Sequence, residues 1–381
     1  MRAMSRTRSR DRVVALLRAR GAATQADIAR GTGLSRTTVA GIVTELRDRG
    51  VVVDVGPEAR RAGRPATVIG LSPSLGAVAG VDFGHSHVRV AVADLAHTIL
   101  AERERRLRVD LDARAALDLA ARLVDEALVE AGVARDAVAG VGMGVPGPVD
   151  RARGVVGSAT VLPGWAGVRA AEELGRRIGL AVEMDNDANL GALAEHTFGA
   201  GRGCADLAYI KVSTGVGCGL VLNGDPYRGA AGTAGEIGHM RVDDGDTFCY
   251  CGNRGCLETL ASGCAVQEML ERSQRRRLAL DEIVAQALAG HPACARAVGD
   301  TGRHIGVAIA HLCNMLNPRR VVVGGVLAGA GDLLLAPLRD SFLRNVVRAA
   351  ADSVEIVPGQ LGERAEVLGA LALALRTAGP R

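Results

Sequence analysis

"ADLAYIKVSTGVGCGLVLNG", residues 205–224, carries the clearest indication of the architecture of this chain. A hydrophobic strand enters a glycine-rich turn, and a second hydrophobic strand leaves it. The same order occurs earlier in "AVAGVDFGHSHVRVAVADL", residues 77–95. Two hairpins of this kind in one chain predict a duplicated fold with two lobes and a cleft between them.

Strands and helices alternate from residue 77 onward, which predicts an α/β class for the main body of the chain. Between the hairpins, a strand ends in Asp185-Asn186-Asp187 and a helix follows. Ligands of α/β proteins bind beyond the carboxyl ends of strands. Asn186 and Asp187 are therefore candidates to hold ligand hydroxyl groups, and Asp187 is also a candidate general base. Asp185 is expected to cap the helix.

The two glycine turns are candidate phosphate sites because such turns expose backbone N–H groups. Each turn taken singly is weak evidence, since glycine turns join strands in many proteins. The candidate residues are Gly84 in the first turn and Thr214, Gly215 and Gly217 in the second.

One histidine and three cysteines gather in "HMRVDDGDTFCYCGNRGCLE", residues 239–258, which we call the cysteine loop. Thiolates and imidazole bind zinc, and four such groups close a tetrahedral shell, which makes the site structural. Gly252 and Gly255 are expected to let the backbone fold back. Free thiols are the alternative. The predicted zinc ligands are His239, Cys249, Cys251 and Cys256.

The first 72 residues have the pattern of a winged helix-turn-helix. We expect helices at 10–21, 25–31 and 36–48, with a tight turn at 32–35 and Ser35 capping the third helix. Apolar residues at helical spacing in 36–48 predict one buried face. The N-terminal end of this recognition helix then faces a major groove. The predicted contacts there are Ser35, Arg36, Thr37 and Thr38.

Strands at 51–55 and 66–71 are expected to flank a wing whose tip carries Arg61 and Arg64, and an arginine held this way can enter a minor groove. Residues 1–72 hold 14 arginines and six acidic residues, a net charge of +8, which leaves −4 on the rest of a +4 chain. This asymmetry indicates a polyanion partner at one end. A small helical domain that binds protein is the alternative.

Composition and length favour a cytoplasmic protein of two or three domains. The chain has 381 residues, of which 48% are hydrophobic and 23% charged. No secretory signal and no stretch of about 18 uncharged apolar residues is present, so no membrane partner is expected. Eight irregularly spaced cysteines do not resemble a disulfide framework in a chain of this size.

Several motifs resemble the ROK family of repressors, open reading frames and sugar kinases. They are "GVPG" (144–147), "DNDANLGALAE" (185–195), "STGVGCG" (213–219), "GTAGEIGH" (232–239), "CYCGNRGCLE" (249–258) and "NPRRVVVGG" (317–325). The resemblance implies a two-lobed actin-like/hexokinase-like (ribonuclease H-like) ATPase fold at 76–381 behind a head at 1–75. Lobe one is expected at about 76–187 plus the helix 365–377, and lobe two at about 188–364. The implied sugar contacts are Asn186, Asp187, Glu236, His239 and Glu258, and the implied zinc ligands are the four named above.

The first glycine turn departs from the family's D-x-G-G-T pattern. It has His85 in place of the second glycine, where a side chain would crowd a phosphate, and His87 follows where a kinase often has lysine. This puts the use of ATP in doubt. We therefore predict a sugar-responsive repressor of carbohydrate genes without efficient kinase activity. The alternative is a glucokinase-like, ATP-dependent sugar kinase with a DNA-binding head, in which Asp187 is catalytic.

The expected mechanism links sugar to DNA. A sugar in the cleft favours one closure of the lobes, and this closure changes the spacing of two heads on paired half-sites of operator DNA. A homodimer or homotetramer is implied by the resemblance and by this need for paired half-sites. We expect sugar binding to lower the affinity for DNA and release it; corepression, in which sugar raises that affinity, is the alternative.

Overall fold

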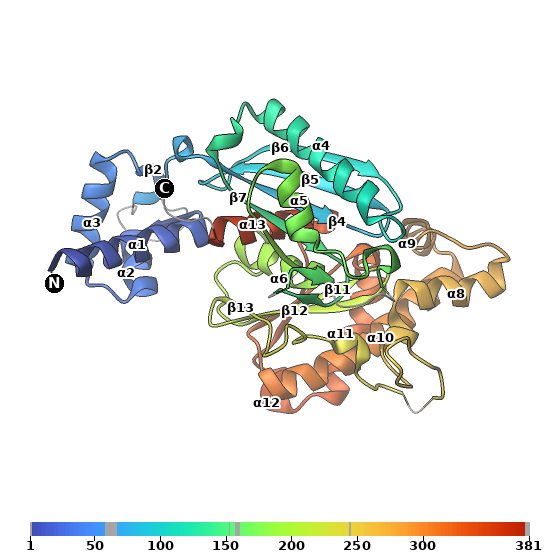
Figure 1. The fold of residues 1–381 in the computed structure, drawn as a ribbon. Helices are drawn as coiled ribbons and strands as arrows, with labels where there is room; N and C mark the ends of the chain where they lie inside the picture. The colour runs from blue at the N-terminus through green and yellow to red at the C-terminus, as the bar shows by residue number, and fades with distance from the viewer. Residues whose placement is uncertain (1, 58–66, 152, 157–160, 244, 378–381) are drawn as a thin grey trace. The chain divides into compact units, whose positions relative to one another are not determined.

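The structure is a computed structural model that describes residues 2–57, 67–151, 153–156, 161–243 and 245–377. Figure 1 traces the chain from its N-terminus to its C-terminus. Contacts divide the chain into two compact units. Unit 1 comprises Met1–Val145, Arg153–Asp185 and Ala370–Arg381, and unit 2 comprises Pro146–Ala152 and Asn186–Gly369.

The N-terminal part of unit 1 is a winged helix-turn-helix, as predicted. Its helices are α1 (Arg2–Arg20), α2 (Gln25–Thr32) and α3 (Arg36–Asp48), and its strands are β1 (Ala22–Thr24), β2 (Val52–Pro57) and β3 (Thr67–Leu71). The three strands form a sheet in the order β1-β3-β2. The bounds of α3 are those expected from the sequence. Helix α1 begins earlier than expected, and β1 was not predicted because three residues carry no periodic signal.

Helix α3 begins where a polar cap meets an apolar stripe. Ser35 is its N-cap, and its Oγ accepts a hydrogen bond of 3.1 Å from the backbone N–H of Thr38. This bond satisfies one of the N–H groups that the first turn leaves without a helical partner. The buried face of α3 consists of Val39, Ile42, Val43 and Leu46, as the spacing predicted.

The main sheet of unit 1 has five strands in the order β10-β7-β4-β5-β6. Strands β4 and β5 and strands β5 and β6 are antiparallel, whereas β7 runs parallel to β4. Helix α4 (Ala113–Ala131) packs on β5 and β6, and α5 (Ala170–Ile178) packs on α4. The strands are β4 (Ala77–Phe83), β5 (His87–Asp94), β6 (Ile99–Arg106), β7 (Val138–Val145) and β10 (Val182–Asn186).

The sheet of unit 2 repeats this topology. Its order is β13-β12-β11-β14-β15, with an antiparallel meander β11-β12-β13 and with β14 and β15 parallel to β11. The meander, the adjacent parallel strand and the outer strand occupy equivalent places in both sheets, which confirms the predicted duplication. The strands are β11 (Leu207–Val212), β12 (Val216–Leu222), β13 (Asp225–Tyr227), β14 (Arg320–Gly324) and β15 (Glu355–Pro358).

Helices cover the sheet of unit 2 and complete its core. Helix α6 (Asp187–Thr197) packs on β11 and β12, and the long helix α10 (Pro292–Leu316) packs on α11 (Asp332–Asn345). The other helices are α7 (Glu258–Ala261), α8 (Gly263–Gln274), α9 (Leu280–Leu288) and α12 (Arg348–Ala351); α13 (Ala365–Thr377) begins in unit 2 and ends in unit 1. Among the described residues, no helix combines the length and apolar character needed to cross a membrane.

Candidate functional site

The end of β10 and the start of α6 carry the first candidate residues, and Asn186 is the N-cap there. Its Oδ1 accepts hydrogen bonds from the N–H groups of Ala188 (2.9 Å) and Asn189 (3.2 Å), and its Nδ2 donates to the Gly147 carbonyl (2.8 Å). The expectation that Asp185 caps the helix is wrong. Asp185 still belongs to the strand and is buried, with 1% of its surface exposed. Asn186 is the residue that stands at the change of backbone conformation.

The carboxylate of Asp187 is held from both sides. Its Oδ1 accepts from the N–H of Ala188 (2.8 Å) and from Asn186 Nδ2 (3.0 Å), and its Oδ2 accepts from Lys211 Nζ (2.8 Å). Lys211 was not identified from the sequence as a site residue. A signal was present, because Lys211 is the only lysine in the chain.

Glu258 lies against the second glycine turn. Its Oε2 accepts a hydrogen bond of 2.8 Å from the N–H of Val216, and a Cβ added to Gly215 would lie 2.8 Å from its Oε1. Burial raises the pKa of Glu258 to about 7, although the bond from Val216 opposes the shift. A glutamate in this state can accept or donate a hydrogen bond to a hydroxyl group near neutral pH.

The residue Glu236 is exposed to solvent, yet protein atoms partly desolvate its carboxyl group. Burial raises its pKa, and the negative charge of Asp187 adds to the shift. Glu236 also contributes to the raised pKa of Glu258. Glu236 therefore lies close enough to interact with the charges of both Asp187 and Glu258, and all three residues belong to unit 2.

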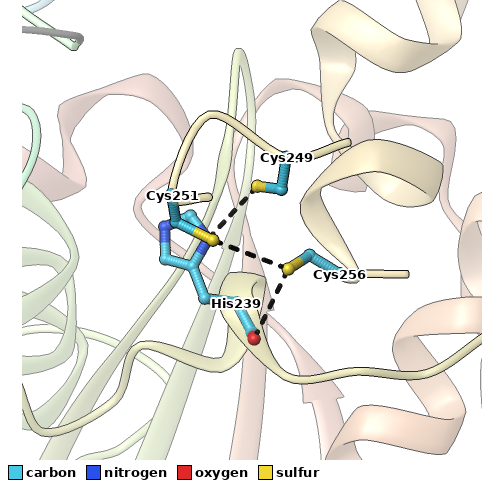
Figure 2. Close-up of side chains that lie close together, drawn as sticks. All are labelled: His239, Cys249, Cys251 and Cys256. Carbon is cyan, nitrogen blue, oxygen red and sulfur yellow. Dashed lines mark hydrogen bonds between the residues drawn. The ribbon is translucent and has the colours of Figure 1, made fainter. Parts of the chain in front are cut away.

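The cysteine loop brings its four predicted ligands together. One ligand atom from each of them lies within 4.8 Å of the others, and Figure 2 shows the side chains converging. Cys249 Sγ lies 3.5 Å from His239 Nδ1, and Cys251 Sγ lies 3.7 Å from Cys256 Sγ. With Zn–S bonds of about 2.3 Å and a Zn–N bond of about 2.0–2.1 Å, a tetrahedral site separates S from N by about 3.5 Å and S from S by about 3.8 Å. The donor set therefore fits a tetrahedral metal ion.

Two glycines fold the cysteine loop back on itself. Gly252 and Gly255 have φ angles of +93° and +68°, a conformation that disfavours other residues. A Cβ on Gly255 would lie 2.1 Å from the Asp243 carbonyl oxygen, so the loop closes too tightly for a side chain there. The N–H of Val242 donates to the Gly255 carbonyl (3.0 Å), which joins the two arms of the loop. The predicted role of these glycines is confirmed.

The ring of His239 turns its Nδ1 toward the cysteines, as Figure 2 shows. Burial lowers the pKa of His239, which favours the neutral imidazole that metal binding requires. Tyr250 contacts the ring edge-to-face, with 5.0 Å between centroids. The ring therefore has a defined orientation, in which Nδ1 faces the cysteines of the candidate metal site and Nε2 lies on the opposite side of the ring.

The first glycine turn is occupied by the ring of His87. His87 Nε2 lies 3.0 Å from Asp82 Oδ2, and a Cβ added to Gly84 would lie 2.2 Å from the ring. The sequence had attributed crowding of this turn to His85, whereas the structure places the imidazole of His87 there. The ring of His87 therefore covers the side of Gly84 on which a Cβ would lie.

Glycines of the second turn serve helix packing. A Cβ on Gly217 would lie 2.8 Å from Ala188 Cβ, and one on Gly219 would lie 2.2 Å from the Ala188 carbonyl oxygen. The small residues thus let α6 approach β12 closely. Packing accounts for these two glycines without a phosphate, and phosphate binding by Thr214, Gly215 and Gly217 stays a prediction.

The candidate DNA-binding residues at the start of α3 share one property, exposure to solvent. Arg36, Thr37 and Thr38 follow the cap, and all four side chains including that of Ser35 are exposed. The predicted wing-tip contacts Arg61 and Arg64 lie outside the described residues.

Comparison with protein families gives two matches. The model described as the ROK family matches residues 78–377, and a winged helix-turn-helix DNA-binding model matches residues 8–53. A xylose repressor of Caldicellulosiruptor bescii is 29% identical over 355 residues, which cover 90% of this chain and 89% of the relative.

Solved structures of both kinds of ROK protein resemble the chain. A ROK family transcriptional regulator, a homologue of the Escherichia coli MLC protein, has a TM-score of 0.74 and 25% identity, covering 93% of this chain and 92% of its own. A ROK family glucokinase of Streptomyces griseus, in complex with glucose and AMPPNP, has a TM-score of 0.69 and 30% identity. That match covers 78% of this chain and 99% of the glucokinase.

Proposed function

The chain belongs to the ROK family, with a winged helix-turn-helix ahead of the ROK domain, and from this membership we propose that it is a sugar-responsive transcriptional repressor. The observation that carries the proposal is the continuous match, over about nine-tenths of both chains, to a xylose repressor. We divide the chain into a DNA-binding head at 1–75 and a sugar-kinase-like body at 76–381, with the lobe limits expected from the sequence. A DNA partner implies a cytoplasmic protein.

Exposure of the α3 N-terminus supports duplex DNA as the partner. Arg36, Thr37 and Thr38 project from the end of the helix that enters the major groove in helix-turn-helix proteins. Arg36 supplies a bidentate donor suited to guanine, and the hydroxyls of Thr37 and Thr38 suit phosphates or base edges. Arg61 and Arg64 are assigned to the minor groove on the sequence pattern alone.

The sugar site proposed here consists of Asn186, Asp187, Glu236, His239 and Glu258. Glu236 interacts electrostatically with Asp187 and with Glu258, and sugar hydroxyls are donors and acceptors that suit carboxylates. A structural zinc on His239, Cys249, Cys251 and Cys256 would hold the loop that carries His239 and leads into Glu258. With Nδ1 on the metal, Nε2 of His239 can contact a hydroxyl group. The chain is similar to proteins named xylose repressor, glucokinase and N-acetylglucosamine repressor, and these names support xylose, glucose or N-acetylglucosamine as the effector.

The first glycine turn supports regulation rather than phosphoryl transfer. A kinase of this kind needs the phosphates of ATP held by backbone N–H groups and a carboxylate free to take the acceptor's proton. Here His87 covers Gly84, and Asp187 is bonded to a lysine. A glucokinase-like activity is the second candidate, because ROK glucokinases match most of the body and Asp187 is present.

A dimer completes the proposed mechanism. Sugar binding favours one closure of the body, and this closure separates two heads by a distance that no longer matches the half-sites of an operator. Homodimer or homotetramer assembly is part of the proposal, because operator symmetry mirrors the symmetry of the protein.

Operator binding in the presence of sugars tests the repressor proposal. The full chain, loaded with zinc, is titrated onto DNA from upstream of its own gene at fixed salt, with xylose, glucose, N-acetylglucosamine or glucose 6-phosphate added. We expect at least one sugar to weaken binding about 5- to 150-fold, the usual range of coupling between two sites. Operator affinity that none of these sugars changes would refute the proposal.

A coupled assay of ATP consumption with the same sugars tests the second candidate. We expect no turnover above background. Robust sugar-dependent turnover that Asp187→Asn abolishes would replace the repressor proposal with a kinase.

A further inference from the structure

Lys211 is an exception within this chain. The chain carries 45 arginines and this single lysine. Of the 46 lysine and arginine positions, 45 therefore carry a guanidinium group, and only position 211 carries an ammonium group. The two groups differ in shape, because the ammonium is a compact charge and the guanidinium is a planar fork that needs more room. The exception raises the question of what a compact cation does at this position.

Lys211 lies between two carboxylates. Its Nζ is 2.8 Å from Asp187 Oδ2 and 3.1 Å from Glu366 Oε1. The exposed fractions of the three side chains are 18%, 16% and 9% for Lys211, Asp187 and Glu366. At this burial the charges are poorly screened by water, so each carboxylate depends on the ammonium between them.

The three residues come from elements that lie far apart in the sequence. Asp187 opens α6, Lys211 lies in β11, and Glu366 belongs to the first turn of α13. Lys211 thus links the residue we assign to the sugar site with the beginning of the last helix.

Helix α13 starts in unit 2, where Glu366 lies, and continues into unit 1. Within unit 2, a Cβ on Gly369 would lie 2.0 Å from the Leu190 carbonyl oxygen, so α13 touches the backbone of α6. Within unit 1, a Cβ on Gly142 would lie 1.9 Å from the Ala370 carbonyl oxygen, so α13 also touches the backbone of β7. Packing this close, backbone against backbone, transmits a shift rather than absorbing it.

We infer that Lys211 is a positioning residue that couples saccharide contact at Asp187 to helix α13. This inference rests on the proposed function. When a sugar hydroxyl donates to Asp187 Oδ2, it competes with Lys211 Nζ for that oxygen. The ammonium then bonds more strongly to Glu366, and the first turn of α13 shifts together with Glu366. The ligand shifts the population only by the difference in its affinity for the two arrangements.

The compact ammonium also explains why arginine is absent here. A guanidinium would form fixed bidentate bonds to one carboxylate, which favours a static pair. An ammonium on a flexible stem can redistribute its three hydrogen bonds between two acceptors. The same bond to Asp187 withdraws a lone pair from a would-be general base, in agreement with a pocket that holds sugar without deprotonating it.

The test uses the full zinc-loaded chain and three variants, Lys211→Met, Lys211→Arg and Glu366→Gln. Glu355→Gln is the matched control, because it breaks an ion pair between Arg320 and Glu355 at the edge of the same sheet. Two quantities are measured for each protein: the Kd of the sugars named above by calorimetry, and the ratio of operator affinity without and with sugar. If a residue has only a structural role, its substitution should lower stability without changing the operator ratio independently of the sugar Kd.

For Glu366→Gln, which keeps the Lys211–Asp187 pair, we expect a nearly unchanged sugar Kd and an operator ratio that falls toward one. Lys211→Met is expected to lower both the sugar affinity and the ratio, and Lys211→Arg is expected not to restore the ratio. Glu355→Gln should behave as the unmodified chain. Since Glu366→Gln retains the buried pair, it remains informative even if Lys211→Met fails to fold.

The outcomes separate this inference from the proposed function. A chain whose operator binding responds to no sugar refutes the proposed function itself. A chain that responds, and whose ratio is unchanged in Glu366→Gln or fully restored by Lys211→Arg, leaves the repressor proposal standing and refutes the coupling through Lys211.

Discussion

Individual side chains of the cysteine loop determine whether a metal is held. His239, Cys249, Cys251 and Cys256 place four donors at the separations of a tetrahedral shell. The backbone N–H of Asn253 lowers the pKa of Cys251, which helps this exposed thiol reach the thiolate form that binds metal. The geometry of the shell depends on each donor, so one substitution tests it.

Cys251→Ser is expected to reduce zinc affinity by more than the about 10- to 100-fold that loss of an outer-shell partner costs, because it removes a direct ligand. Zinc content after dialysis, measured by inductively coupled plasma mass spectrometry, checks this. Cys204→Ser, outside the cysteine loop, is the control and should keep full zinc. Equal zinc content in both variants would contradict the assignment of the ligand set.

Arg36 is the side chain on which the DNA proposal is most directly testable. A bidentate contact to a base contributes about 1–3 kcal/mol of discrimination, so Arg36→Ala should weaken specific operator binding about 5-fold or more. Arg30→Ala removes the same charge from α2 and is the control. Gel shifts with specific and scrambled DNA at one salt concentration measure the effect. A uniform loss on both DNAs would assign Arg36 to phosphate instead.

At the scale of elements, the contact between α6 and β12 fixes where Asn186 and Asp187 lie. Ala188 sits directly over Gly217 and Gly219, so the start of α6 rests on the backbone of the strand. Gly217, which the sequence suggested for phosphate binding, therefore already has a structural role. The position of the proposed sugar contacts follows from this packing.

Gly219→Ala places a Cβ 2.2 Å from the Ala188 carbonyl oxygen, and α6 must move to accommodate it. Overpacking of this kind lowers the free energy of unfolding by about 1–3 kcal/mol. Urea denaturation followed by circular dichroism measures the change. In Gly140→Ala, a glycine-to-alanine control in β7, the nearest atom to the added Cβ is 3.9 Å away, and no comparable loss is expected. Equal stability of both variants would contradict the close approach.

Across the molecule, the candidate metal site and the candidate DNA-binding helix belong to different units. The four predicted metal ligands lie in unit 2, whereas α3 and the rest of the head lie in unit 1. Unit 1 also contains a contact between head and body, a hydrogen bond of 2.7 Å from His97 Nε2 to the Arg18 carbonyl at the end of α1. The head is thus joined to the body by more than its covalent connection.

Removal of the metal from the full chain by a chelator is expected to weaken sugar binding while leaving sugar-free operator affinity within about 2-fold, because the head's own fold contains no part of the metal site. Calorimetry measures the affinity for sugar, and gel shifts without sugar measure the affinity for operator DNA. Readdition of zinc should restore sugar binding. An equal loss of operator affinity on chelation would show that the cysteine loop supports the head directly.

Local sequence patterns alone determined much of this protein. The sequence predicted the bounds of α3, the duplicated hairpins, and the clustering of His239 with three cysteines around Gly252 and Gly255. These predictions were possible because caps, periodicity and short loops act over a few residues. The family resemblance came from motifs of the same short range. These features depend on neighbours along the chain, which the sequence displays directly.

Other features of the site follow from the folded arrangement of the chain. In the structure, Glu366 lies beside Lys211, which also contacts Asp187. The N-cap of α6 is Asn186 and not Asp185, and the ring of His87 lies against Gly84. The first of these features depends on the packing of elements from separate parts of the chain, the second on where strand β10 ends, and the third on the register of the hairpin β4-β5. Such contacts follow from the sum of many burial and packing energies over the whole fold, and no short stretch of sequence contains that sum.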